Sequence, residues 1–431
     1  MAVIWAKQAG SWNDVTDEGH VWMWHNPDTG QNEEYIVDGV RRLPDIGDTV
    51  YFNSYIITYT NDVNLGNGWL RNDANEEYGI VSGGRLQRIA NGSTTITANC
   101  YADTACLFYN YGTNTTTYTV TIIGNCVCPS TATSGLVQGN AGGYARRSVA
   151  VVGNVDCSRG GCLAYNLAGV GTFSISGNVI IGNGTLYHCS TNYVNSSTIT
   201  GKVTCADGAT GSLTNVYFNT NNTLKIGSID FSNGLAQLTT STSSITHNVK
   251  ISGDVKISNN LTSQAGGTAT IGGDVYSNRG FYGTVTSITV NGSLTQISRS
   301  WGGSMQGQCR VNGDVHLLEG ARLITYCYYL ILGGNVYVDS NVATPASPSP
   351  LGCIIYTLTT PDDFRIIYTG DEYPQLMYIS GYDLNNRQQY PSEDDVKKNV
   401  EYAYGAKKGK LEPVNNTNTI NIYPNAKRYP L

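Results

Sequence analysis

Charged residues are scarce in this chain: they fill 13% of its 431 positions and leave a net charge of −6. The basic residues form no stripe or face of the kind that binds nucleic acid, which excludes a nucleic-acid partner. No apolar run reaches the roughly eighteen residues of a membrane-spanning helix, so we expect no membrane insertion. The first residues lack the basic and apolar regions of a signal peptide, and we therefore expect synthesis in a reducing cytoplasm with free thiols.

Catalytic and metal-binding patterns are also missing. The 5 histidines are scattered, and the 11 cysteines show no metal-type spacing, because Cys126 and Cys128 stand closer together than a zinc pair allows. No nucleophile motif occurs. We predict no enzyme activity, no catalytic residues, no metal site and no cofactor.

The chain is rich in glycine (50 residues) and tyrosine (30 residues), with many threonines, serines and asparagines and 40% hydrophobic residues. This composition favours many short strands joined by turns, and few helices. The hydrophobic content is high enough to form a packed core rather than a disordered chain.

A short phrase recurs along the middle of the chain, as in Ile175-Ser176-Gly177-Asn178-Val179-Ile180-Ile181. Its glycines are 19 to 26 residues apart and are Gly153, Gly177, Gly201, Gly227, Gly253, Gly273, Gly292, Gly313 and Gly334. Weaker copies surround Gly124 and Gly84. The apolar residues of each copy alternate, which is the strand period, and a strand with one apolar row must stack on further copies to bury it.

The repeat predicts an all-β fold, a right-handed parallel β-helix of about ten turns and on the order of 50 Å in length. A β-propeller is the other class with such repeats, but its blades need roughly 40 residues. The positions two before, two after and four after each glycine should point inward, as Ile251, Val255 and Ile257 illustrate. Three cysteines occupy the last of these positions and are interpreted as small core residues: Cys128, Cys157 and Cys205.

The residue after each repeat glycine is usually Asn, Asp or Ser. The glycine permits a sharp corner or a close backbone approach, and we expect the polar residue to hydrogen-bond local backbone at that corner. On adjacent turns Asp254 and Asp274 would lie about 5 Å apart, a spacing that also suits a retaining glycoside hydrolase. Because Asn and Ser replace Asp in other copies, turn chemistry is the favoured interpretation.

The composition divides the chain into five segments. Residues 1–52 form a Trp-rich N-terminal cap or anchor, and residues 53–340 form the β-helix shaft. Residues 341–350 are a Pro/Ser linker, residues 351–390 a small β region, and residues 391–431 a polar tail. Two short strands are predicted near Ile354–Leu358 and Phe364–Tyr368.

Four of the six tryptophans lie in the first segment: Trp5, Trp12, Trp22 and Trp24. They are interpreted as cap core, which a solenoid needs at its end, with a docking anchor as the alternative. Residues 1–80 carry a net charge of −9, which indicates a solvated surface or a docking surface.

Tyrosines form two groups, Tyr109 with Tyr111 and Tyr326 with Tyr328 and Tyr329. Both groups fit half-buried strand surface, and the alternative is stacking on sugar rings or on a neighbouring chain. No binding residue is assigned.

Both ends of the chain resemble bacteriophage virion proteins with a β-helical shaft. Near the start, Gly10-Ser11-Trp12-Asn13-Asp14 and the Pro/Gly/Asp turn from Leu43 to Phe52 resemble the opening of β-helical phage and surface proteins. Near the end, the segment from Pro391 to Pro413 is similar to a short motif of phage virion proteins, with Lys397 and Lys398 in its basic stretch but Asn399 where glycine is commoner. The resemblance implies a head-fibre, tail-fibre or spike subunit.

The expected function is therefore structural: a virion appendage that attaches to the host surface or to another virion protein. The resemblance implies assembly in the host cytoplasm, a homotrimer, capsid or tail proteins as partners through a terminal anchor, and a host glycan or receptor as a further partner. Two alternatives stay open, a polysaccharide-degrading tailspike with a hydrolase or lyase site, and a bacterial surface adhesin.

Overall fold

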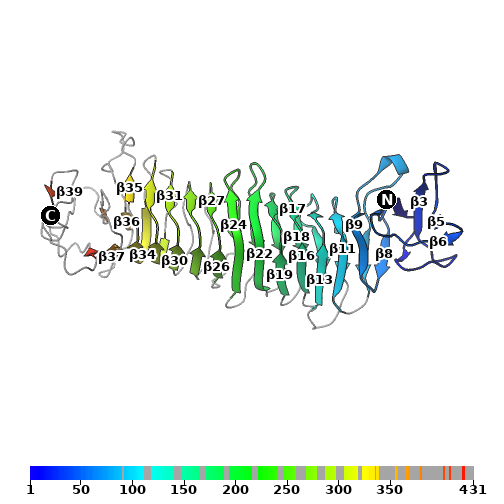
Figure 1. Cartoon of the computed structure of the whole chain (residues 1–431), viewed down its shortest axis with the longest axis horizontal. Helices are drawn as coiled ribbons and strands as arrows, with labels where there is room; N and C mark the ends of the chain where they lie inside the picture. Colours follow the sequence, from blue (N-terminus) through cyan, green and yellow to red (C-terminus); the bar gives the residue numbers. More distant parts are fainter. Residues whose placement is uncertain are drawn as a thin grey trace. The chain divides into compact units, whose positions relative to one another are not determined.

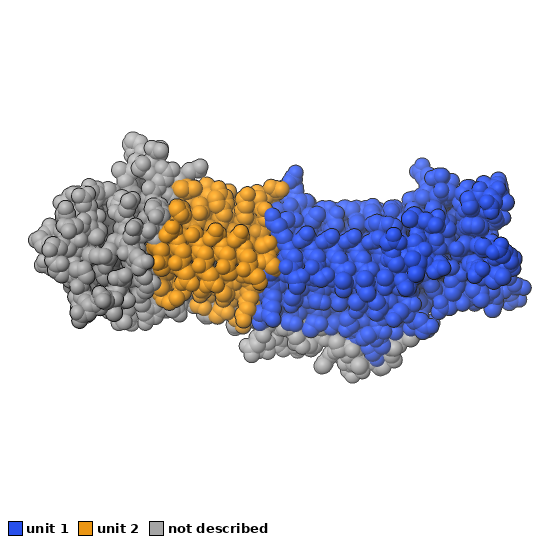
Figure 2. All heavy atoms as spheres, viewed as in Figure 1, with its two compact units in different colours: residues 1–226, 238–241 blue, residues 227–237, 242–431 orange. Residues whose placement is uncertain are grey.

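The computed structural model of the chain describes residues 1–89, 92–110, 118–139, 147–165, 171–188, 194–215, 222–239, 247–258, 268–278, 287–297, 305–318, 323–334 and 336–338, with short strands beyond. The chain divides into two compact units, which Figure 2 colours separately. Unit 1 comprises residues 1–226 and 238–241, and unit 2 comprises residues 227–237 and 242–431. Among the described residues, regular structure is β apart from one short 3-10 helix, η1 (Glu76–Tyr78). The predicted parallel β-helix is confirmed.

Unit 1 repeats a turn of three strands, and each strand pairs in parallel with its equivalent one turn later (Figure 1). We call one such turn a rung and its three sides faces A, B and C. Face A contains β9 (Val63–Arg71), β11 (Thr94–Tyr101), β13 (Tyr118–Ile123), β16 (Arg147–Val152), β19 (Gly171–Ile175) and β22 (Val194–Cys205).

Face B contains β1 (Val3–Ala6), β7 (Thr49–Tyr51), the ends of β9 and β11, β14 (Cys126–Val127), β17 (Val155–Cys157), β20 (Val179–Ile181) and the end of β22. Face C contains β2 (Gly10–Ser11), β8 (Ile56–Tyr59), β10 (Arg85–Arg88), β12 (Phe108–Asn110), β15 (Gly135–Gly139), β18 (Cys162–Tyr165), β21 (Thr185–His188) and β23 (Ser212–Asn215).

Unit 2 shows two parallel columns in its described residues. The first consists of β26 (His247–Ile251), β28 (Thr268–Ile271), β30 (Ser287–Val290), β32 (Met305–Val311) and β34 (Leu323–Leu332). The second runs from Ile229–Phe231 of β24 (Asn222–Phe231) through β27 (Val255–Ile257), β29 (Val275–Ser277), β31 (Leu294–Gln296) and β33 (Val315–Leu317) to β35 (Val336–Val338).

The two strands predicted after the array are present. β36 (Ile355–Thr357) and β37 (Arg365–Tyr368) both pair in parallel with β34, and β41 (Ile420–Ile422) pairs antiparallel with β37. The predicted linker, 341–350, lies outside the described residues. So does the segment resembling phage proteins, except for the hairpin strands β39 (Glu401–Tyr402) and β40 (Lys407–Lys408).

The core follows the predicted inward positions. Ile251, Val255 and Ile257 are each at most 2% exposed, and the described side chains at the matching positions of the other copies from Gly124 onwards are buried as well, except that of Lys225, two before Gly227, which is exposed. The three predicted core cysteines, Cys128, Cys157 and Cys205, are buried. Each fully buried aliphatic side chain contributes roughly 1.5–3 kcal/mol, so the stack is stabilised mainly by this continuous column.

The repeat glycines stand at the corner between faces A and B, where consecutive rungs come into backbone contact. A Cβ on Gly177 would lie 2.3 Å from the carbonyl oxygen of Gly153, and one on Gly201 would lie 2.3 Å from that of Gly177. In unit 2 the amide of Gly313 donates directly to the oxygen of Gly292 at 3.0 Å. At these corners glycine is therefore needed for close approach between rungs.

One weaker copy of the repeat was wrongly aligned. Gly124 stands at the predicted corner, because a Cβ there would meet Ala98 of the previous rung. Gly84 precedes β10 on face C and approaches Tyr55 instead. The error arose because Leu86 stands two after Gly84, as an apolar residue does in the repeat, so this short stretch imitates the repeat without sharing its place in the rung.

The N-terminal segment closes the open end of unit 1. β1 pairs in parallel with β7, so the parallel ladder begins inside the segment assigned to the cap or anchor. On its other side β1 pairs antiparallel with β3 (Trp22–Asn26), which pairs with β4 (Gln31–Glu34), and β5 (Ile36–Val37) and β6 (Val40–Arg41) form a further hairpin. This antiparallel edge prevents the first rung from offering a long parallel edge for aggregation.

Three of the four N-terminal tryptophans are buried in this closure. The rings of Trp12 and Trp22 meet edge to face with centroids 4.9 Å apart, and the Trp22 indole donates to the Trp12 carbonyl at 3.2 Å. Trp5 stacks on Tyr78 at 6.0 Å, while Trp24 is half-buried beside Tyr35. Trp5, Trp12 and Trp22 are thus cap core, as the favoured interpretation predicted.

Candidate functional site

The polar residues after the repeat glycines form a hydrogen-bonded ladder along the corner. In unit 1 the side-chain oxygen of Asn154 accepts from the amide of Asn178 at 2.8 Å, and that of Asn178 accepts from Lys202 at 2.9 Å. The expectation that these side chains bond local backbone was wrong. Each reaches the next rung, because parallel stacking brings the following corner amide closer than any free donor of its own turn.

Asp254 and Asp274 belong to the same ladder in unit 2. Asp254 accepts from the amide of Asp274 at 2.9 Å, and Asp274 accepts from the amide of Ser293 at 2.7 Å. The ladder continues where the Ser293 hydroxyl accepts from Asp314 at 3.2 Å. Both carboxylates are thus aligned by hydrogen bonds to the next rung, which is a structural role, although it is not the local turn bonding that was predicted.

The most distinctive surface of unit 1 is a stack of aromatic rings and guanidinium groups on the outside of face B. We call it the aromatic–arginine ladder, and it consists of Tyr51, Trp69, Arg71, Tyr101 and Arg159. Register places Tyr51, Arg71 and Tyr101 in consecutive rungs. The Arg71 guanidinium carbon lies 5.5, 5.8 and 4.5 Å from the ring centroids of Tyr51, Trp69 and Tyr101, and that of Arg159 lies 5.0 Å from Tyr101.

Carboxylates hold both arginines of the ladder in place. Arg71 Nε donates to Asp73 at 2.8 Å, and Nη2 makes a second bond to the same carboxylate at 2.5 Å. Arg159 donates to Asp103 at 2.8 Å and to the carbonyl of Ala102 at 2.9 Å. The bond to Asp73 raises the pKa of the Arg71 guanidinium, so it stays charged at every physiological pH.

This arrangement can stabilise the stack, but it leaves little ring face for a ligand. The guanidinium groups of Arg71 and Arg159 both contact the Tyr101 ring. Their charges are neutralised by ion pairs with Asp73 and Asp103. Cation–π pairs are worth about 0.5–1 kcal/mol at exposed sites and more when desolvated. The ladder therefore acts as a clamp that joins residues from four rungs, with the rung of β14 lying between those of Tyr101 and Arg159.

Replacing Arg71 with Met should remove the centre of this clamp while keeping the bulk of the side chain. We expect Arg71→Met to lower the free energy of unfolding by about 1–2 kcal/mol, since three ring contacts and a bidentate ion pair are lost together. Denaturant midpoints measure the effect. Lys256→Met is the control, because Lys256 contacts one ring, Tyr276, at 5.8 Å; equal losses for the two variants would contradict the clamp.

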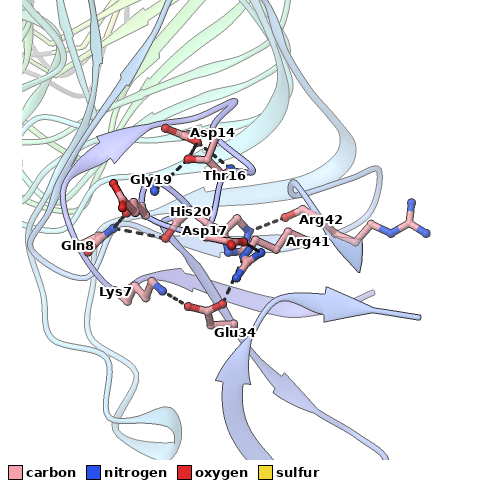
Figure 3. Close-up of polar contacts among 11 residues, drawn as sticks. Lys7, Gln8, Asp14, Thr16, Asp17, Gly19, His20, Glu34, Arg41 and Arg42 are labelled. Carbon is pink, nitrogen blue, oxygen red and sulfur yellow. Dashed lines mark hydrogen bonds and ion pairs between the residues drawn. The ribbon is translucent and has the colours of Figure 1, made fainter. Parts of the chain in front are cut away.

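A second polar cluster lies in the N-terminal closure (Figure 3). Glu34 receives ion pairs from Lys7 and, at 3.5 Å, from Arg41, which also pairs with Asp17. Gln8 donates to the carbonyls of Glu18 and His20, and Thr16 donates twice to Asp14. The cluster ties the 14–20 loop and the β4 and β6 strands to the strand end at Lys7.

His20 sits at the centre of that cluster and is fully buried. Its Nε2 lies 3.0 Å from the Arg42 carbonyl, which can only accept, so Nε2 carries the proton. Its Nδ1 is buried with no hydrogen-bond partner. Among the described residues, no three His, Cys, Asp or Glu side chains gather closely enough to hold a metal ion.

The Glu34 ion pairs should make the closure sensitive to acid. The bond from Lys7 lowers the pKa of Glu34 below its ordinary value of 4.5, so its stabilising contribution is complete above that value and is lost as the pH falls through the lower folded-state pKa. With a side chain 32% exposed, the loss should stay below about 1 kcal/mol. Unfolding of wild type and Glu34→Gln at pH 7 and pH 3 measures it: the difference between the two should be smaller at pH 3 than at pH 7.

Of the two tyrosine groups predicted from the sequence, only Tyr109 has a side chain among the described residues. Tyr109 is half-buried on face C with the Arg85 guanidinium 4.3 Å from its ring, which fits strand surface. Tyr326, Tyr328 and Tyr329 belong to β34, but their side chains and all of Tyr111 lie outside the described residues. The sequence alone did not identify Arg71, Tyr101 and Arg159 as neighbours, because their proximity follows from the register between rungs and not from any sequence pattern.

Comparison with known proteins adds no identification. No protein-family model, no curated protein and no solved structure matches the chain. In the part that the structure describes, no helix is long and apolar enough to cross a membrane. The fold therefore defines the class, a parallel β-helix with a closed N-terminal end.

Proposed function

We propose that this chain is a structural subunit of a virion appendage, a head-fibre, tail-fibre or spike protein that mediates attachment. One observation supports the proposal: polar side chains that could act in catalysis or ligand binding instead bond one rung to the next. The corner ladder uses Asp254 and Asp274 as backbone acceptors, and the aromatic–arginine ladder pairs its own charges. A stack bonded in this way suits a rigid structural shaft.

A virion appendage needs one end that docks on the virion and a defined oligomeric state. The N-terminal closure, with its net charge of −9 over residues 1–80, is the docking end in this proposal, and its partner is a capsid or tail protein. The shaft assembles as a homotrimer in the host cytoplasm and contacts a host glycan or receptor. The resemblance at both ends of the chain supports this part of the proposal.

Light scattering and negative-stain images of the full chain test the assembly. A trimeric rod with one wider end is the expected result, and a compact monomer would overturn the trimeric appendage. Release of reducing sugar ends from host surface polysaccharide tests the alternative of a depolymerase. Activity that disappears in Asp254→Asn or Asp274→Asn would replace the structural function by an enzymatic one.

A further inference from the structure

The interior of unit 1 contains cysteines that are neighbours across consecutive rungs. Cys100 in β11 and Cys126 in β14 are directly paired in the parallel register of face B. Val127 pairs with Asp156 in the next register position, which brings Cys128 and Cys157 side by side one step further along. All four side chains are at most 1% exposed and are free thiols in this structure.

The backbone register places both pairs at a Cα separation that a disulfide can span. The amide of Cys100 donates to Asn125 and that of Cys128 to Asp156, each at 2.8 Å, so both cysteine pairs sit within regular ladder pairing. Parallel neighbours are about 4.8 Å apart, which falls inside the Cα separation of roughly 4.4–6.8 Å found for disulfides. The side chains of each pair also point to the same side, because both occupy inward positions.

We propose that Cys100–Cys126 and Cys128–Cys157 are rung-to-rung disulfide sites that close when the folded protein meets a two-electron thiol oxidant. The four thiols would then join three consecutive rungs by covalent bonds through the core. With an azodicarboxamide such as diamide, one thiolate adds to the N=N bond and its partner thiolate attacks the bound sulfur. The pair loses two electrons and two protons, and the oxidant is reduced to the hydrazine.

The environment of the pairs sets how fast this reaction runs. Burial raises the pKa of Cys100 and of Cys128, and the contacts with Cys126 and Cys157 raise these pKa values further. Because the thiolate is the attacking species, oxidation should be slow at pH 7 and faster at pH 9. The neutral, buried thiols also explain why the reduced chain packs them as ordinary core residues.

The test uses the folded full-length protein and diamide at pH 9, followed by alkylation in denaturant. Intact mass should show the loss of four hydrogens and two fewer pairs of alkylated thiols. Cleavage after aromatic and basic residues separates the Cys100 and Cys157 peptides from the one that carries both Cys126 and Cys128, and it places Cys162 on a peptide of its own, because Arg159 lies between Cys157 and Cys162. The expected product joins all three peptides, and the guanidinium midpoint should rise on oxidation and return after reduction.

Two matched variants assign the bonds. Cys126→Ala should release the Cys100 peptide and keep the Cys157 peptide attached, and Cys128→Ala should do the reverse. Protein oxidised after unfolding provides the reference for random pairing. The proposal is overturned if folded wild-type protein keeps all its thiols under these conditions, or if the product links Cys128 to Cys162 or matches the random mixture.

Discussion

Replacement of Asn72 by alanine should be among the most damaging single changes in the described part of the chain. Asn72 is 1% exposed and lies just after β9, where face B turns towards face C. Its amide nitrogen is 3.4, 3.2 and 3.3 Å from the carbonyl oxygens of Gly84, Ala105 and Cys106, and its side-chain oxygen accepts from the Asp103 amide at 2.7 Å. One side chain thus satisfies the backbone of two rungs.

Removing these bonds leaves buried carbonyls and a buried amide without partners, and each such group costs about 1–3 kcal/mol. We therefore expect Asn72→Ala to lower the free energy of unfolding by about 2–4 kcal/mol, read from guanidinium denaturation. Asn99→Ala is the matched control: Asn99 bonds Asn67 and Asn125 at 3.0 Å each, but it is only half-buried and both bonds face solvent, so water can replace them. Similar losses for the two variants would show that burial does not decide the effect.

The fold was predictable because its main determinant repeats within the sequence. Alternating apolar residues around Gly177 or Gly253 show which side chains point inward, and the repeat spacing gives the length of a rung. Register between rungs follows from the same phrase, since a one-residue slip would turn Ile251 and Ile257 outward. The burial of Cys128, Cys157 and Cys205 was predictable for this reason, as each occupies an inward position of the phrase.

Features that depend on contacts between different phrases were not predictable. Arg71 and Tyr101 lie 30 residues apart in the sequence and belong to no recurring pattern, so only the stacked register brings them together. Asn72 carries no sequence signal either, because its four partners lie 12 to 34 residues away, in its own rung and in the next one. The side-chain bonds of the corner ladder were assigned to the wrong rung for the same reason: a local rule cannot show which amide lies above.

Rung-to-rung contact also decides the effect of a methyl group at the repeat corner. A Cβ on Gly177 would lie 2.3 Å from the oxygen and 2.5 Å from the carbonyl carbon of Gly153, both of them backbone atoms that cannot rotate away. At the same position of the phrase, a Cβ on Gly253 would lie no closer than 3.1 Å to the Gly227 oxygen. The same substitution should therefore have different results in the two rungs.

We expect Gly177→Ala to lower the free energy of unfolding by about 1–3 kcal/mol, the usual cost of forcing atoms into a well-packed site. Gly253→Ala should be within about 0.5 kcal/mol of wild type, because a small steric cost there is offset by the lower entropy of the unfolded chain, roughly 0.4–1 kcal/mol. Denaturant midpoints of the two variants measure the difference directly. If Gly253→Ala were as damaging as Gly177→Ala, a shared need for glycine's backbone freedom, rather than close approach between rungs, would explain why the repeat keeps glycine at this corner.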